Sequence, residues 1–186
     1  MRMLLGAALL GLGALAHADS AYTPVLGVFL INDQLSMAQH GINPSSDSST
    51  GLGFGLALDG GGRERLSLEY TDFDLGDSRQ LQLLDANADY FCTSDRLPPA
   101  LKPFAGLALG YGRLDFPTQA GLGGDRAEHL AYGARLGVVW DFAPQLALEL
   151  GGRYLQASLT TRPGGAAEFA VQADTSLWLG LEYRLR

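Results

Sequence analysis

Apolar and polar residues alternate along most of this chain with a period of two. In residues 176–185 the odd positions hold leucine or tyrosine, whereas the even positions hold serine, tryptophan, glycine, glutamate and arginine. Successive side chains of a strand point to opposite faces, so this alternation predicts strands with one buried face. It recurs in 51–59, 64–74 and 127–142 without a long apolar stripe of helical period. The pattern therefore predicts an all-β chain.

Eight strands follow from the pattern: 23–32, 51–59, 64–74, 80–91, 102–115, 127–142, 145–159 and 168–185. Their connections alternate in length, because "GGGR" and "AP" are short whereas "QLSMAQHGINPSSDSSTG" and "FPTQAGLGGDR" are long. Short turns at one end and long loops at the other are typical of outer-membrane barrels, whose spanning strands need about 9–11 residues. We therefore predict an eight-stranded antiparallel up-and-down transmembrane β-barrel.

The N-terminus has the layout of a secretory signal peptide. Arg2 precedes an apolar run over residues 3–16, and the small-residue pattern Ala16-His17-Ala18 follows. This run is shorter than the roughly 20 residues of a membrane-spanning helix. We expect cleavage after Ala18, with residues 1–18 as the signal peptide and residues 19–186 as one outer-membrane barrel domain.

The charged residues indicate which face meets lipid. Arg135 and Arg153 lie near the middles of their strands, and each would cost roughly 2–4 kcal/mol at the bilayer midplane. The apolar face is therefore expected outside, and the lumen of an eight-stranded barrel is just wide enough for side chains to fill. The hypothesis is a lumen network that blocks a wide aqueous path, formed by Arg65, Glu69, Arg135, Glu149, Arg153, Glu182 and Arg184.

Aromatic residues also favour a membrane protein. Two interfacial girdles are expected, with Trp140, Phe142 and Tyr183 at one end and Tyr111, Tyr154 and Phe169 at the other. The alternative is a soluble periplasmic ligand-binding barrel, in which these residues fill a core. Against it, the chain contains one lysine, and its supposed water-facing side would be rich in Gly and Ala.

Composition excludes several other classes of protein. Removal of the signal peptide leaves 12 basic and 20 acidic residues (13 minus Arg2, and 20), a formal charge of −8. The basic residues are dispersed, so no nucleic-acid role is expected. A single cysteine permits no intramolecular disulfide and no thiolate zinc cluster. The acids of "TDFDLGDS" lack the remaining ligands of a calcium loop. No metal or cofactor is expected.

A nucleophile and base for catalysis are not evident either. His129 and His40 are the candidate bases, and serines occur in the first long loop, but a triad is defined by geometry rather than by presence. We therefore expect no enzyme and no catalytic residues. A lipid A-modifying barrel enzyme remains an alternative.

Three phrases, "KPFAGLALGYG", "GARLGVVWDFAPQLALELGGRYL" and "LGLEYRLR", resemble the transmembrane barrel of outer-membrane protein A and the related opacity-type small barrels. The resemblance covers nearly all of the mature chain. It implies a monomer of the cell outer membrane, in contact with its lipid and lipopolysaccharide and inserted by the barrel-assembly machinery. The implied roles are envelope integrity, surface contact or limited solute passage through a narrow channel.

The sequence departs from this family in two ways. Such barrels usually end in an aromatic residue, whereas here Leu185 is followed by Arg186. Gly180, Tyr183 and Leu185 still match the terminal assembly signal when it is read one residue in from the end. The peptidoglycan-binding domain that follows the barrel in many relatives has no counterpart, so no wall-anchoring function is expected.

Overall fold

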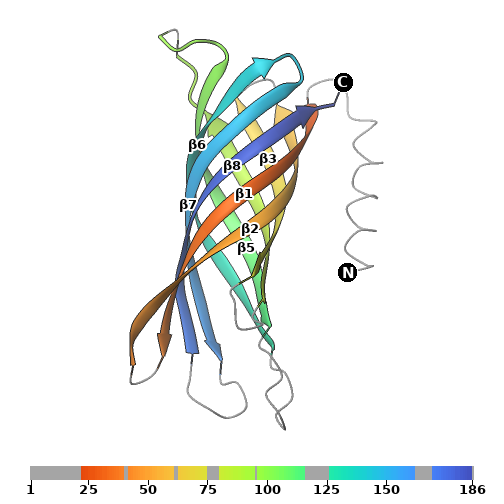
Figure 1. The fold of residues 1–186 in the computed structure, drawn as a ribbon. Helices are drawn as coiled ribbons and strands as arrows, with labels where there is room; N and C mark the ends of the chain where they lie inside the picture. The colour runs from red at the N-terminus through yellow and green to blue at the C-terminus, as the bar shows by residue number, and fades with distance from the viewer. Residues whose placement is uncertain are drawn as a thin grey trace.

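The computed structural model describes residues 22–39, 42–60, 63–74, 80–94, 96–115, 126–161 and 169–185. They form eight strands: β1 (Tyr22–Gln39), β2 (Ile42–Gly60), β3 (Glu64–Asp74), β4 (Gln80–Phe91), β5 (Leu101–Asp115), β6 (Arg126–Ala143), β7 (Leu146–Thr161) and β8 (Phe169–Arg184). Each strand pairs antiparallel with its sequence neighbours, and β1 also pairs with β8, so the sheet closes into a barrel (Figure 1). The predicted fold class is confirmed. The predicted signal peptide and its cleavage site lie outside the described residues.

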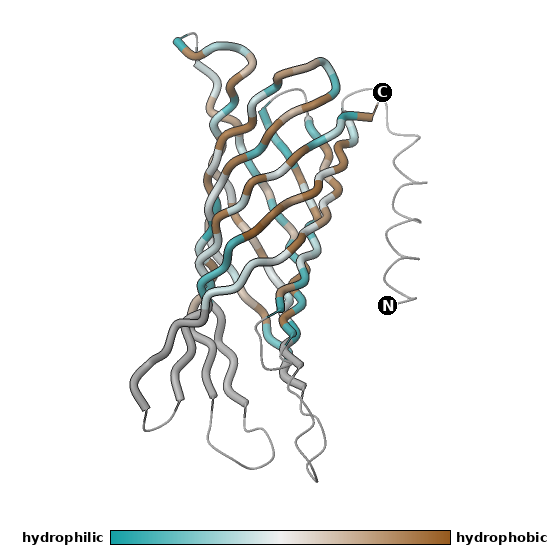
Figure 2. The backbone as a smooth tube through the Cα atoms, viewed as in Figure 1, coloured by the Kyte–Doolittle hydropathy of each residue, from teal (hydrophilic) through white to brown (hydrophobic). Residues whose placement is uncertain are grey.

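Hydrophobic and hydrophilic residues alternate along the strands (Figure 2), and their exposure places leucines on the outer wall and charged side chains in the lumen. Outward Leu107, Leu136 and Leu177 are 70%, 68% and 64% exposed, whereas inward Arg135 and Arg153 are 2% and 4% exposed. A soluble barrel would show the opposite distribution, while lipid around the wall matches this one. The predicted orientation of the two faces is confirmed. No helix among the described residues is long and apolar enough to cross a membrane.

Outward aromatic side chains lie toward both ends of this apolar wall. Trp140 and Phe142 are 48% and 44% exposed near the β6–β7 turn, with ring centroids 5.9 Å apart. Tyr183 is 43% exposed at the same end, and Tyr111 and Tyr154 point outward further along their strands. The side chain of Phe169, the sixth residue predicted for the girdles, is not among those described. This distribution is typical of a barrel with two interfacial girdles.

The first hairpin is longer than the alternation indicated. The prediction of an 18-residue loop after residue 32 is wrong, because β1 and β2 stay paired from Asn32↔Thr50 to Met37↔Ser45, and a register shift precedes Gln39↔Ile42. Residues 43–50 ("NPSSDSST") are polar or proline at consecutive positions, so the apolar alternation disappears although the backbone pairing continues.

Candidate functional site

Glu149 of β7 is buried in the lumen, where it contacts residues of three other strands. Its Oε2 accepts a hydrogen bond from Arg65 Nη1 (2.8 Å), and its Oε1 accepts from Arg135 Nη2 (2.8 Å) and from Trp178 Nε1 (2.7 Å). These residues come from β7, β3, β6 and β8, and all four are at least 95% buried. A single carboxylate therefore ties opposite sides of the barrel together.

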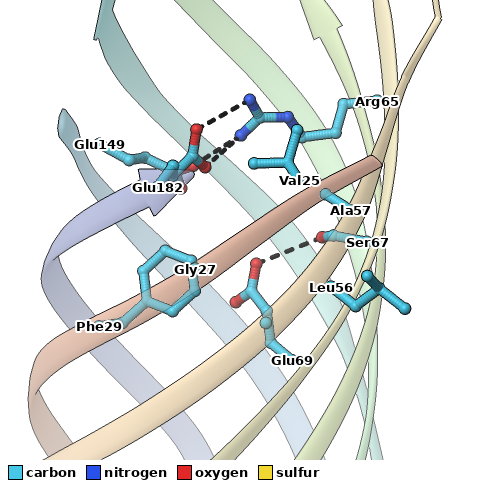
Figure 3. A pocket seen from close by; sticks show the side chains of 11 residues that line it. Val25, Gly27, Phe29, Leu56, Ala57, Arg65, Ser67, Glu69, Glu149 and Glu182 are labelled. Carbon is cyan, nitrogen blue, oxygen red and sulfur yellow. Dashed lines mark hydrogen bonds and ion pairs between the residues drawn. The ribbon is translucent and has the colours of Figure 1, made fainter. Parts of the chain in front are cut away.

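The two arginines extend this arrangement to further carboxylates. Arg65 binds both oxygens of Glu182, at 2.7 and 3.1 Å (Figure 3). Arg135 donates to Glu69 Oε1 at 2.6 Å. Such charge-assisted contacts are stronger than neutral hydrogen bonds. The structure thus brings five of the seven predicted network residues into one group, which we call the central cluster: Arg65, Glu69, Arg135, Glu149 and Glu182.

Aromatic rings surround the two guanidinium groups of the central cluster. Arg65 lies over Phe91, 5.1 Å from the ring centroid, and Arg135 lies 5.4 Å from Phe104 and 4.7 Å from Trp178. Rings at these distances attract a cation through their π face. They also supply apolar volume, so ion pairs and aromatic rings together fill this level of the lumen.

Glycines on neighbouring strands make room for inward rings. A Cβ added to Gly180 would overlap the ring of Phe29, and one added to Gly151 would overlap the indole of Trp178. A cavity beside Phe29, which Arg65 and Glu69 also line, has a volume of about 10 Å³ (Figure 3). That space is about the volume of one water probe.

Arg153 lies outside the central cluster. Its Nη1 contacts Asp85, and its Nε donates to Ser176 Oγ at 3.1 Å. Ser176 Oγ in turn lies 2.9 Å from Asp33 Oδ1 and 2.8 Å from Asp174 Oδ1. We call these five residues the Arg153 cluster. The hypothesis paired Arg153 with lumen glutamates, whereas the structure places it against an aspartate of β4.

Arg184 lies at the rim of the barrel. Its Nη2 donates to Asp141 Oδ1 at 2.6 Å, and its Nε lies 3.5 Å from Asp59 Oδ2. Asp59 also accepts from Arg65 Nε at 2.6 Å, and Lys102 Nζ lies 2.9 Å from Asp141 Oδ2. Asp59 thus connects the rim to the central cluster, and the network continues to the end of the barrel.

Buried carboxyls outnumber buried arginines in the lumen. Among the described residues the buried acidic side chains are Asp33, Glu69, Asp85, Asp89, Glu149, Asp174 and Glu182, seven in all, against Arg65, Arg135 and Arg153. Asp89 lies 3.4 Å from Arg135 Nε. The interior of the barrel therefore carries an excess of acidic groups.

The sequence reasoning did not select the aspartates of β4. Asp85, Asn87 and Asp89 occupy alternate positions, and all three are buried. That polar repeat of period two could have identified the inward face of this strand. The adjacent Leu81 and Leu83 obscured it, because they also point inward and are 2% and 1% exposed. With Phe73 and Leu155 they belong to the apolar cluster inside the barrel.

The structure also shows the positions of the three residues predicted to form the assembly signal. Gly180 faces Phe29, Tyr183 is outward, and the Leu185 amide donates to the Pro24 carbonyl at 2.9 Å. Their role as an assembly signal stays a prediction.

His129 is 8% exposed, and in the part of the chain described here its Nδ1 has no hydrogen-bond partner. Across the described ranges no group of three His, Cys, Asp or Glu side chains is arranged to hold a metal.

Comparisons with known proteins identify the fold. No protein-family model and no curated protein matches the chain. Among solved structures, Neisserial surface protein A superposes with a TM-score of 0.65 at 15% identity, over 89% of this chain and 98% of that one. Outer membrane protein AlkL gives 0.58 at 15% (88% and 90%), and the attachment invasion locus protein Ail of Yersinia pestis gives 0.51 at 14% (88% and 99%). The chain thus has the fold of small eight-stranded outer-membrane barrels, as the sequence resemblance implied.

Proposed function

We propose that this chain is an outer-membrane barrel protein with a structural role in the envelope or a role in surface contact, and that side chains close its lumen to solutes. The observation that carries the proposal is the sharing of Glu149 by Arg65, Arg135 and Trp178. Contacts from four strands meet there, beside a cavity of about 10 Å³. This arrangement favours a plug over a pore.

The energetics of the central cluster support a closed state. Opening a path for solutes requires guanidinium groups to leave buried carboxylates, and breaking one buried pair costs about 3–5 kcal/mol. Each 1.4 kcal/mol changes an equilibrium constant tenfold. If opening breaks one pair, the open state is therefore populated at roughly one part in a hundred to one in several thousand. Several pairs would have to break together, so passive solute flux would be small.

The outer wall and the similar structures support the proposed location. An apolar wall with aromatic residues toward both ends suits a bilayer. The closed sheet leaves no strand edge to pair with another chain, which favours a monomer. We accordingly propose outer-membrane lipid, lipopolysaccharide and the barrel-assembly machinery as partners, and no enzymatic activity. The names of two proteins with this fold, Neisserial surface protein A and the attachment invasion locus protein, support a role in surface contact.

Two measurements test the location and the plug. Cells expressing the chain are fractionated, and the membrane fraction is run in SDS with and without boiling. We expect the band in the outer-membrane fraction and a heat-dependent mobility shift, since a closed barrel keeps its backbone hydrogen bonds in cold detergent. A soluble periplasmic band without a shift would instead favour the ligand-binding alternative.

The purified barrel is then reconstituted in liposomes for swelling assays with small sugars. We expect swelling no faster than in empty liposomes, with a known porin as the positive control. Swelling above that background would contradict the plug and favour the narrow channel. A change in lipid A structure that depends on expression, and that is lost in His129→Ala, would contradict the absence of catalysis.

A further inference from the structure

We propose that the outer wall over β3, β4 and β5 binds one phospholipid whose headgroup carries a primary amine, of the phosphatidylethanolamine type. The inference rests on the proposed location in the outer membrane. It starts from a hollow of about 450 Å³ in the lipid-facing wall, which we call the β3–β5 groove. Its outward lining residues are Glu64, Leu66, Ala88, Tyr90, Ala105 and Leu107.

Small residues form the floor of the groove, and large ones form its sides. Ala88 lies directly between Leu66 on β3 and Leu107 on β5, and Ala105 lies opposite Tyr90. Leu66, Tyr90 and Leu107 are 54%, 55% and 70% exposed, so they stand out from the wall. The volume is in the range of about 300–1,000 Å³ that is common for ligand pockets. The apolar residues that line the floor and sides suit a flexible acyl chain.

Charged residues lie at one end of the groove and in the turn beside it. β3 begins at Glu64, which points outward opposite Tyr90, near the end of β4. Arg63 precedes it in the β2–β3 turn, is exposed, and its carbonyl accepts a 2.7 Å hydrogen bond from the Phe91 amide. In the described part of the chain neither the Arg63 nor the Glu64 side chain forms an ion pair.

These two side chains complement a zwitterionic headgroup. A guanidinium binds phosphate oxygens, and a carboxylate accepts hydrogen bonds from an ammonium group. Arg63 can therefore bind the phosphate while Glu64 binds the amine. A choline headgroup has no N–H to donate, and a glycerol headgroup has no positive charge, so both are weaker partners for Glu64. Tyr90 supplies the amphipathic ring that suits the level between headgroup and acyl chain.

Native mass spectrometry of the folded full-length barrel tests the proposal. The protein is released from micelles that contain equal amounts of phosphatidylethanolamine, phosphatidylcholine and phosphatidylglycerol with identical acyl chains. We expect one retained phosphatidylethanolamine, favoured over the other two by up to about fivefold, the effect of a partly exposed ion pair. Glu64→Gln should bring the preference over phosphatidylcholine close to one.

A second variant tests the groove itself. Ala88→Phe fills the floor and should remove the retained lipid, whereas Thr175→Phe places the same ring on the outward face of β8 and should leave retention unchanged. Three results would overturn the proposal. They are equal retention of the three lipids, equal retention of phosphatidylethanolamine in the two phenylalanine variants, and a complex of two protein chains that Ala88→Phe abolishes. The heat-dependent mobility shift identifies any variant that fails to fold. If Ala88→Phe does not fold, the lipid preference of Glu64→Gln decides the test. A heat-modifiable outer-membrane barrel without lipid preference would refute only the groove, whereas a soluble protein would refute the proposed function as well.

Discussion

The Trp178 indole donates a 2.7 Å hydrogen bond to Oε1 of Glu149, the same oxygen that accepts from Arg135. The indole ring also lies 4.7 Å from the Arg135 guanidinium. Trp178 therefore contacts both members of this ion pair. Its N–H contacts Glu149, and its π face contacts Arg135. The ion pair and the aromatic filling of the lumen are thus parts of one arrangement, in which loss of Glu149 should affect both.

Replacing Glu149 by Gln should destabilise the barrel. The substitution keeps the shape of the side chain but leaves Arg65 and Arg135 without a shared carboxylate, and breaking a buried pair costs about 3–5 kcal/mol. Unfolding by urea in detergent micelles, followed by tryptophan fluorescence, measures the loss. Trp178→Phe removes one hydrogen bond to a charged group and should cost less, about 1.5–3 kcal/mol. Equal stability of Glu149→Gln and the wild type would contradict the central role of Glu149.

Removing both arginines of the central cluster should open a cation-selective path. Arg65→Ala combined with Arg135→Ala removes two bulky groups and leaves Arg153 as the one buried arginine against seven buried acidic side chains among the described residues. Planar bilayer recordings under a KCl gradient measure both conductance and reversal potential. We expect conductance above that of the wild type, with a reversal potential that indicates selectivity for K⁺ over chloride. Unchanged conductance, or selectivity for chloride, would argue against this description of the lumen.

Arg153 and Asp85 form a separate test, because their contact does not involve the central cluster. Arg153→Leu leaves Asp85, which is 0% exposed, without its guanidinium partner, and should cost about 3–5 kcal/mol. The double variant Arg153→Leu with Asp85→Asn should recover part of that loss. Urea unfolding of the two single variants and the double variant gives the coupling energy. Strictly additive effects would mean that the pair does not stabilise the fold.

The sequence predicted the barrel and the inward side of its membrane-level strands, because lipid outside and charge inside impose a strict alternation. The extension of β1 and β2 to Gln39 and Ile42 could not be predicted in this way, since residues 43–50 ("NPSSDSST") are polar or proline at consecutive positions and show no apolar alternation. The partner of Arg153 could not be predicted from the sequence either. Asp85 lies 68 residues away in sequence, and its placement depends on the stagger of strands around the barrel, which alternation within one strand does not encode.

Cys92 provides a test of orientation in the membrane. It is the one cysteine of the chain, is exposed, and follows β4 at the end of the barrel that carries the β6–β7 turn. If the short turns are periplasmic, a membrane-impermeant maleimide should label it only after the outer membrane is permeabilised. As a control, Ser48→Cys in a Cys92→Ser background places the thiol on the exposed outward face near the opposite end. That control should react in intact cells, and the reverse labelling pattern would place the short turns at the cell surface.

Gly180 has a packing role that can be separated from a role in assembly. It lies directly opposite Phe29 across the β1–β8 pair, and a Cβ there would overlap the ring. Gly180→Ala should therefore cost about 1–3 kcal/mol, as overpacking does, even when the purified chain refolds into micelles without any assembly machinery. In a Phe29→Ala background the overlapping ring is gone, so Gly180→Ala should cost little there, and a double-mutant cycle separates this contact from the about 3–5 kcal/mol that Phe29→Ala itself costs. If Gly180→Ala refolds normally in micelles but accumulates outside the membrane in cells, the glycine serves recognition by the machinery and its packing against Phe29 is secondary.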